Sequence, residues 1–235
     1  MIKFFRKIRY DLMEKNKTGK YFKYAVGEIA LVVIGILIAL SINNWNESRQ
    51  EKVALETIYE TIKNDLKNDI QEGKSILNHY NPLGGFYVKL IKGTLSEKDY
   101  DECNCGKTLI GFKDLYLNKR GFELLKQTNN ELIKNSDLPD NILNFYNKNL
   151  TYFRLIEGTL NTYMFELTKK WSEKDWWSDF NSGIDETGFR DYLINNKNAN
   201  NEMSSFRDAL VRIYLPRINN FIIEAEVIIS EIEKR

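Results

Sequence analysis

The sequence predicts an all-α protein in which one transmembrane helix continues into an antiparallel bundle of helices outside the membrane. Three observations support this prediction. One 18-residue stretch carries a single charge, and apolar residues recur at spacings of three and four over three long segments. Signals for β-strands are nearly absent. The 235 residues suffice for a sizeable core in one domain or two small ones.

The membrane segment is the clearest of these features. Ala25 to Ile42 reads AVGEIALVVIGILIALSI, and a helix of this length spans about 27 Å, close to the thickness of a hydrocarbon core. We expect the transmembrane helix to cover residues 24–46. A cleaved signal peptide is the alternative, with Ala39 and Ser41 at the cleavage site, but its apolar region would be unusually long. The sequence therefore favours an uncleaved anchor.

The flanking charges predict the orientation of this helix. Residues 1–23 hold eight Lys and Arg and two acids, whereas residues 43–51 hold one Arg and two Glu. Because an excess of Lys and Arg stays in the cytoplasm, we expect a cytoplasmic N-terminus, an inner-membrane location and a periplasmic domain over residues 47–235. Residues 1–23 also alternate basic and apolar side chains, which favours a short helix on the inner leaflet over an irregular basic anchor.

The N-terminal region carries a resemblance to a known family. It begins MIKFFRKIR and continues, from Gly27 to Glu47, as GEIALVVIGILIALSINNWNE. This pattern resembles a family of small single-span membrane proteins of unknown function found in Bacteroidota. The later stretches NKRGFELLKQTNNELI and NILNFYNKNL are similar to that family's extracytoplasmic region. The family has no assigned reaction, so the resemblance implies a topology and a bacterial source, and no catalytic residues.

The spacing of apolar residues and the positions of proline and capping residues predict the remaining elements. A first helix should run from about Tyr24 to His79 and end before Pro82, because proline interrupts a helix. A capped turn at Ser96 and a loop over residues 101–107 should follow. Further helices are expected over residues 120–126, 139–173, 187–195 and 201–233, with a kink in the last at Pro216.

Composition excludes several kinds of site. The charges nearly balance, with 34 Lys and Arg against 33 Asp and Glu, which argues against a basic nucleic-acid-binding chain. The single His and two Cys exclude multi-His, Cys-rich zinc and iron–sulfur sites. No phosphate-loop or dinucleotide motif occurs, and no Ser/His/Asp triad can be assembled around His79 alone. We therefore expect no enzyme activity, no cofactor and no nucleic-acid partner.

One face of the membrane helix carries the candidate intramembrane residues. Glu28, Gly35, Ala39 and Asn43 are spaced to share it. Gly35 and Ala39 form a pair of small residues that lets another helix approach closely, which favours a homo-oligomer. Glu28 could line an ion path in such an oligomer. Its place near the cytoplasmic end of the helix favours instead a carboxylate that pairs with Lys23 or reaches the head groups.

The remaining candidates lie at the interfaces and beyond the membrane. Lys20, Lys23 and Trp45 suit interface anchors. Cys103 and Cys105 are compatible with a strained mutual disulfide, with intermolecular bonds or with free thiols, and we expect a structural role. Trp176 and Trp177 form an aromatic group with Trp171 and Phe180 that could bind a ligand or partner. Packing of that group onto the bundle is the favoured interpretation.

These features predict a non-enzymatic role. We expect a scaffold, or an oligomerising or accessory component of an envelope complex, whose partners are the lipid bilayer, a second copy and an unidentified envelope protein. A periplasmic ligand-sensing module is one alternative, by analogy with helical bundles that bind small ligands. An ion-conducting oligomer that uses Glu28 is the other.

Overall fold

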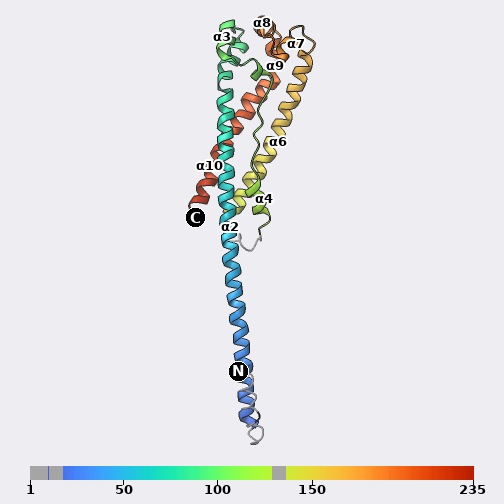
Figure 1. Cartoon of the computed structure of the whole chain (residues 1–235). Helices are drawn as coiled ribbons and strands as arrows, with labels where there is room; N and C mark the ends of the chain where they lie inside the picture. Colours follow the sequence, from blue (N-terminus) through green and yellow to red (C-terminus); the bar gives the residue numbers. More distant parts are fainter. Residues whose placement is uncertain (1–9, 11–17, 129–135) are drawn as a thin grey trace. The chain divides into compact units, whose positions relative to one another are not determined.

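The fold consists of helices joined by short connections (Figure 1). The computed structural model describes Tyr10, residues 18–128 and residues 136–235, and within them it contains no β-strand. The predicted all-α fold class is therefore confirmed. Apart from Tyr10 and its last six residues, the basic segment 1–23 lies outside the described residues, so the predicted surface helix there stays a prediction.

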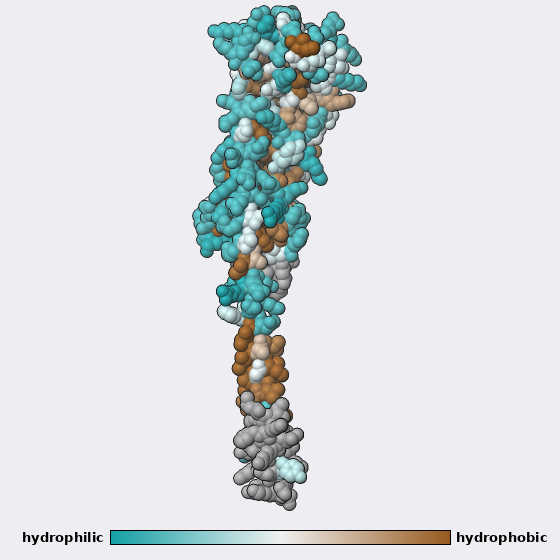
Figure 2. All heavy atoms as spheres, viewed as in Figure 1, coloured by the Kyte–Doolittle hydropathy of each residue, from teal (hydrophilic) through white to brown (hydrophobic). Residues whose placement is uncertain are grey.

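The chain divides into two compact units, unit 1 over Met1–Glu56 and unit 2 over Thr57–Arg235. The boundary falls inside helix α2, which runs from Thr18 to Lys92. In unit 1, α2 is long and apolar enough to cross a membrane. Its large apolar side chains from Ile29 to Ile42 are 47–64% exposed, and Figure 2 shows them as a continuous apolar band. A band of this kind is stable in hydrocarbon and costly in water.

Helix α2 continues beyond the predicted end at His79. It passes through Pro82, Gly84 and Gly85 and ends at Lys92. The expected break was wrong because the following turns bury one apolar face, formed by Leu83, Phe86, Tyr87 and Leu90. Burial of four large side chains outweighs the roughly 3 kcal/mol that an interior proline costs a helix.

The next segment was predicted in part. Helix α3 (Glu97–Cys103) begins with a capping box, in which the Ser96 side chain and the Asp99 side chain each bond the other's backbone N–H. This confirms the capped turn. The predicted loop at 101–107 starts too early, because α3 includes Asp101–Cys103 and ends at Asn104 in the left-handed conformation, with φ of 46°. A 3₁₀ turn, η1 (Lys107–Ile110), follows.

Residues 111–119, here called the strap, have no regular secondary structure and lead into helix α4 (Arg120–Lys126). The strap reverses the chain direction between the two longest helices of unit 2. Asn118 bonds Asp69 of α2, whereas Lys113 bonds Tyr80 about three turns further along α2. The strap therefore runs opposite to α2, and the bounds of α4 agree with the prediction.

Helix α6 (Leu138–Trp171) runs in the same direction as α2 and opposite to α10 (Leu215–Glu233). Ion pairs give the register against α10: Lys74 of α2 lies 3.3 Å from Glu226, and Lys148 of α6 lies 2.8 Å from Glu224. Lys67, about two turns before Lys74 on α2, lies 3.9 Å from Glu233. The antiparallel arrangement thus holds for α10 against both partners. Helices α2 and α6 are parallel instead, because the strap returns the chain along unit 2 before α6 begins.

The C-terminal part was predicted as one helix over residues 201–233 and consists of three segments. They are α9 (Ala199–Asp208), a wide π-helical segment η2 (Ala209–Tyr214) and α10. The wide turn ends two residues before Pro216, which cannot donate a backbone hydrogen bond. The kink expected at Pro216 stays a prediction. Two short helices precede α9, namely α7 (Trp177–Ser182) and α8 (Thr187–Asn195).

Aromatic side chains build the core of unit 2. Tyr146 of α6 stacks on Phe122 of α4, with ring centroids 4.9 Å apart. Phe153 of α6 contacts the rings of Tyr214 and Phe221. These rings are 0–3% exposed, and such contacts add to the stability gained by burial alone.

Candidate functional site

The strap is held mainly by side chains from the helices on either side of it. On the α2 side, the backbone N–H and the side-chain amide of Asn118 donate to Asp69 at 3.1 and 2.6 Å. On the α6 side, the backbone N–H of Leu115 donates to Oε1 of Glu157 at 3.1 Å. Because buried backbone groups need partners, these carboxylates fix the path of a segment that has no neighbouring strand.

Two tyrosines hold the strap at Lys113. The backbone N–H of Lys113 donates to the hydroxyl of Tyr80 at 2.7 Å, and its carbonyl accepts from the hydroxyl of Tyr214 at 2.7 Å. Burial raises the pKa of Tyr80 to about 12, despite the lowering effect of the Lys113 N–H. Both hydroxyls therefore stay protonated over the physiological range.

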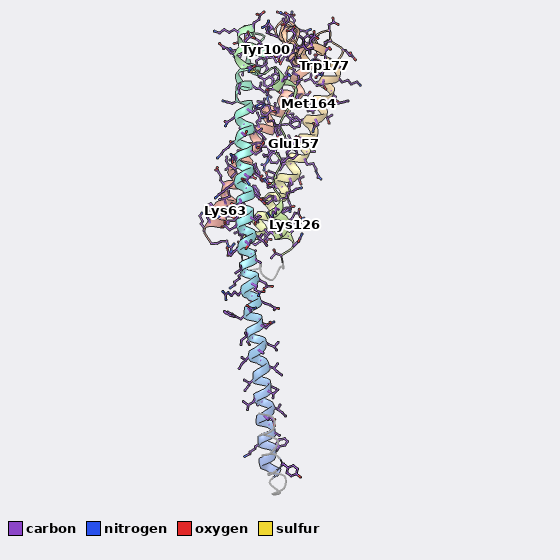
Figure 3. All side chains as sticks on the ribbon, viewed as in Figure 1. Lys63, Tyr100, Lys126, Glu157, Met164 and Trp177 are labelled. Carbon is purple, nitrogen blue, oxygen red and sulfur yellow. A yellow bond between two sulfur atoms is a disulfide. The ribbon has the colours of Figure 1, made fainter. Side chains whose placement is uncertain are left out.

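A cleft of about 620 Å³ opens between the strap and α6, here called the strap cleft. Its polar lining comes from Asp114, Tyr116, Lys119, Thr151, Arg154, Glu157 and Asn161, and its apolar lining from Leu115, Leu117, Leu150 and Phe153. Figure 3 shows Glu157 on α6, between the end of unit 2 that carries Lys126 and the end that carries Trp177. The volume falls in the range of small-molecule sites.

Glu157 is the half-buried carboxylate of the strap cleft. Burial raises its pKa, the N–H of Leu115 lowers it, and the negative charge of Asp114 raises it again, with a net shift above the ordinary value. Burial and the charges of Glu157 and Asp114 also raise the pKa of Tyr214. The negative charges of Asp114 and Glu157 repel each other. A cation or a hydrogen-bond donor bound between them would therefore be stabilising.

Asp114 has one oxygen bonded and one without a partner. The hydroxyl of Tyr116 donates to Oδ2 of Asp114 at 3.0 Å. Oδ1 is buried and accepts no hydrogen bond from any described residue. A buried acceptor without a donor costs about 1–3 kcal/mol, so a donor bound at this oxygen would be stabilising.

The predicted aromatic group lies at the end of unit 2 that carries α7 and α8. Trp171 is fully buried and lies edge-on to Trp176, with centroids 5.7 Å apart. Trp176 in turn contacts Phe180, Phe189 and Tyr192, whereas Trp177 lies beside Phe180 at 6.3 Å. The half-buried rings of Trp176 and Trp177 thus fix α7 and α8 onto the end of α6. These contacts are the ones that packing onto the bundle predicts, whereas the buried Nε1 of Trp176 has no hydrogen-bond partner among the described residues.

Glu202 of α9 joins this group through hydrogen bonds. It accepts from Nε1 of Trp171 at 2.8 Å and from the hydroxyl of Tyr192 at 2.6 Å, and Lys170 lies 3.1 Å away. Burial raises the pKa of Glu202, but the bonds from Tyr192, Trp171 and Lys170 outweigh it and leave the pKa below the ordinary value. The negative charge of Glu202 is therefore stabilised by partners within the fold, which indicates a structural role.

Cys103 and Cys105 form a disulfide with each other. Cys103 is the last residue of α3, and Cys105 is buried with 4% exposure. The bond spans Asn104, whose left-handed backbone ends the helix. Of the alternatives that the sequence leaves open, the structure contains the intramolecular bond.

The predicted residues of the membrane helix lie on α2 in unit 1. No atom lies within 4 Å of the Cβ that a larger residue would place at Gly35, so the small face with Ala39 is open to another helix. Glu28 and Asn43 share that face by their spacing.

The interface anchors can be placed only in part. The Trp45 side chain is 66% exposed, and the guanidinium of Arg49 lies 6.0 Å from its ring centroid. Lys23 is exposed on the first turns of α2. The side chain of Lys20 lies outside the described residues, so its role as an anchor stays a prediction.

Sequence reasoning missed the residues of the strap cleft. Asp114 and Glu157 lie 43 positions apart, and the sequence is rich in carboxylates, so no local pattern distinguishes this pair. The one usable signal is the absence of helical periodicity across residues 111–119, in a chain that is helical on both sides. A segment of that length without its own pattern needs partners from elsewhere in the fold.

The fold and the cleft define a class of protein: an all-α chain with one helix long and apolar enough to cross a membrane, and a helical unit with an open cleft. The model of DUF6090, a family of unknown function, matches residues 28–174, which is more than half of the chain. The protein belongs to the DUF6090 family. The match includes the strap and α6 and ends before α7. No curated protein and no solved structure matches the chain.

Proposed function

We propose that the protein is a single-pass inner-membrane protein whose unit 2 lies in the periplasm and serves as a scaffold or accessory component of an envelope complex, without catalysis. The charge asymmetry supports this orientation, because residues 1–23 carry a formal charge of +6 and residues 47–235 carry −4. A fusion of alkaline phosphatase to Arg235 tests it. Activity in intact cells is expected, and an inactive fusion would reverse the orientation.

The observation that carries the scaffold role is an uncovered face of α6, here called the docking face. Its members are Thr151, Leu155, Gly158, Thr162 and Phe165, which follow one another at alternating spacings of four and three. Leu155 and Phe165 are 66% and 68% exposed. The alternating spacing is the repeat by which one helix packs against another. Large apolar side chains left in water in such a row are typical of an interaction surface.

The docking face also has the relief that helix packing requires. A hollow of about 440 Å³ is lined by Thr151, Arg154, Leu155, Gly158, Thr159 and Thr162, of which Thr151, Arg154 and Gly158 also line the strap cleft. Gly158 has no atom within 4 Å of the position of a Cβ, so the floor of the hollow is backbone. A knob side chain from a neighbouring helix fits a depression of this kind, with Leu155 and Phe165 as the flanking apolar contacts.

Site-specific photo-crosslinking in cells of the source organism tests the docking face. A photoreactive residue at Leu155 or Phe165 is expected to give a discrete adduct with a second copy or with one envelope protein. The same residue at Ile184, which is 78% exposed on a turn outside the face, is the matched control. A chain that is monomeric and gives no adduct at Leu155 or Phe165 beyond the Ile184 background would contradict the scaffold role.

A second candidate is a ligand-sensing module, and the strap cleft favours it. The cleft combines an apolar lining with polar groups that the fold leaves without partners, such as Oδ1 of Asp114. Small-molecule sites share this combination. In this role the chain would pass its signal through a partner at the membrane helix or the docking face. A measurement of ligand binding tests the ligand-sensing role, and the crosslinking experiment does not measure ligand binding.

A further inference from the structure

The strap cleft is lined by charged side chains of both signs. Lys119 and Arg154 line the same cleft as Asp114 and Glu157, and among the described residues none of these four makes an ion pair. Elsewhere in unit 2, opposite charges that share a surface do pair, as Arg217 and Glu224 do at 3.0 Å. A bound molecule with charges of both signs would complement all four groups at once.

The carboxylates each present one oxygen that the fold does not use. Oε1 of Glu157 is held by the N–H of Leu115, and no described residue donates to its Oε2. Oδ2 of Asp114 is held by the hydroxyl of Tyr116, whereas the buried Oδ1 is without a partner. These are acceptors for a group with several N–H donors. An ammonium has three such donors and would also offset the repulsion between the two carboxylates.

The cations and the apolar lining define the rest of the ligand. The guanidinium of Arg154 and the ammonium of Lys119 suit a carboxylate, for which Arg offers paired donors. Leu117, Leu150 and Phe153 provide an apolar surface in the same cleft. The ligand therefore combines an ammonium, a carboxylate and an apolar group within a volume of about 620 Å³.

We propose that the strap cleft binds a small zwitterion of the amino-acid type with an apolar side chain. Asp114 and Glu157 bind its ammonium, Arg154 and Lys119 bind its carboxylate, and the leucines of the lining contact its side chain. This inference rests on the ligand-sensing candidate and specifies its ligand. Strap and α6 each contribute one cation and one carboxylate, so the ligand would join the strap to α6.

Thermal unfolding of the full chain in detergent micelles tests the proposal. L-leucine and L-phenylalanine are expected to raise Tm in a saturable way, because a ligand that binds only the folded state stabilises it. Two analogues of leucine each lack one charge, namely 3-methylbutylamine and 4-methylpentanoate. Each is expected to bind at least about tenfold more weakly than L-leucine, since it leaves either the two carboxylates or the two cations of the cleft without a partner.

Matched variants locate the effect in the cleft. Arg154→Gln and Asp114→Asn are expected to weaken L-leucine binding at least about tenfold. Arg212→Gln and Asp175→Asn remove the same groups from exposed positions outside the cleft and are expected to leave binding unchanged. A far-ultraviolet circular dichroism spectrum equal to that of the wild type shows that each variant is folded.

Three outcomes would overturn the proposal. One is the absence of any Tm shift with all twenty amino acids. Another is binding of a single-charge analogue as tight as that of L-leucine, which would retain a ligand site but reject the zwitterion. The third is unchanged binding in both Arg154→Gln and Asp114→Asn. None of them affects the scaffold role, which the crosslinks at Leu155 and Phe165 test separately.

Discussion

The carboxylate of Asp69 on α2 accepts hydrogen bonds from both the backbone N–H and the side-chain amide of Asn118 on the strap. Asp69 is 1% exposed, and burial raises its pKa to about 6, although the bonds from Asn118 lower it and Asp65 raises it. One buried carboxylate therefore fixes the end of the strap against α2, and it does so at an electrostatic cost.

The raised pKa gives the stability of unit 2 a specific pH dependence. Because the folded state binds the Asp69 proton more tightly than the unfolded state does, this group adds stability as pH falls through about 6 towards 3.8. Relative to Asp69→Asn, the wild type should gain on the order of 2–3 kcal/mol between pH 7 and pH 4. Urea unfolding at both pH values measures this difference. Asp175→Asn, at an exposed position, is the control. An equal change in the pH dependence of the unfolding free energy in Asp69→Asn and Asp175→Asn would contradict the assignment to Asp69.

Gly121 should be intolerant of any side chain. A Cβ there would lie 2.5 Å from Cγ1 of Ile62 and 2.7 Å from its backbone nitrogen, so α4 would have to move away from α2. We expect Gly121→Ala to cost about 1–3 kcal/mol of unfolding free energy. Gly84→Ala is the matched control, because nothing lies within 4 Å of that position and alanine favours a helix by about 1 kcal/mol. Equal effects of the two substitutions would reject the contact.

Glu202 should be needed for the end of unit 2 that contains the tryptophans. Glu202→Ala leaves Nε1 of the buried Trp171 without an acceptor, which should cost about 2–4 kcal/mol. Glu202→Gln keeps one acceptor and should cost less than half of that. Tryptophan fluorescence during denaturation follows both variants, and equal losses would show that packing volume, not the hydrogen bonds, determines the stability here.

The disulfide should contribute little to global stability. Cys103 and Cys105 are two positions apart, so their bond removes few conformations from the unfolded chain. The chain-entropy relation gives at most about 1–2 kcal/mol for such a short loop. Replacement of both by Ser, or addition of a reductant to the wild type, should lower Tm by only a few degrees. A cooperative collapse of unit 2 on reduction would contradict this expectation.

Gly35 should control self-association of the membrane helix if that helix forms the oligomer. Gly35→Leu fills the open position beside Ala39 and keeps the two backbones apart, so dimerisation in a bacterial-membrane reporter assay should fall several-fold. Gly27→Leu is the control, because Gly27 is equally open but lies away from the Gly35–Ala39 face. An unchanged dimer signal for Gly35→Leu would remove the small-residue face from the assembly.

Local signals predicted several elements well and failed at others. The bounds of α4 and α8 agree with the prediction, because periodicity and flanking polar residues define short helices. The end of α2 was missed because Pro82 and Gly84 are local signals, whereas the burial of Leu83 and Phe86 that overrides them depends on the whole unit.

The candidate site was less accessible to sequence reasoning than the fold. Sequence reasoning singled out Trp176 and Cys103, which are rare residue types, and Glu28, which is the single charge of an apolar stretch. The strap cleft uses Asp114, Glu157 and other common residues. Their combination follows only from the tertiary path of the strap.

The strap also determines the order in which unit 2 can assemble. The amides of Lys113, Leu115 and Asn118 find their acceptors 33, 42 and 49 positions away, on Tyr80, Glu157 and Asp69. Such distant closures cost entropy before any contact repays it, so they tend to form late in folding. The polar contacts that link α2, the strap and α6 are complete only when the strap lies between the two helices. Amide hydrogen exchange at Leu115 and Asn118 should therefore report separation of the two helices, and not fraying of either one.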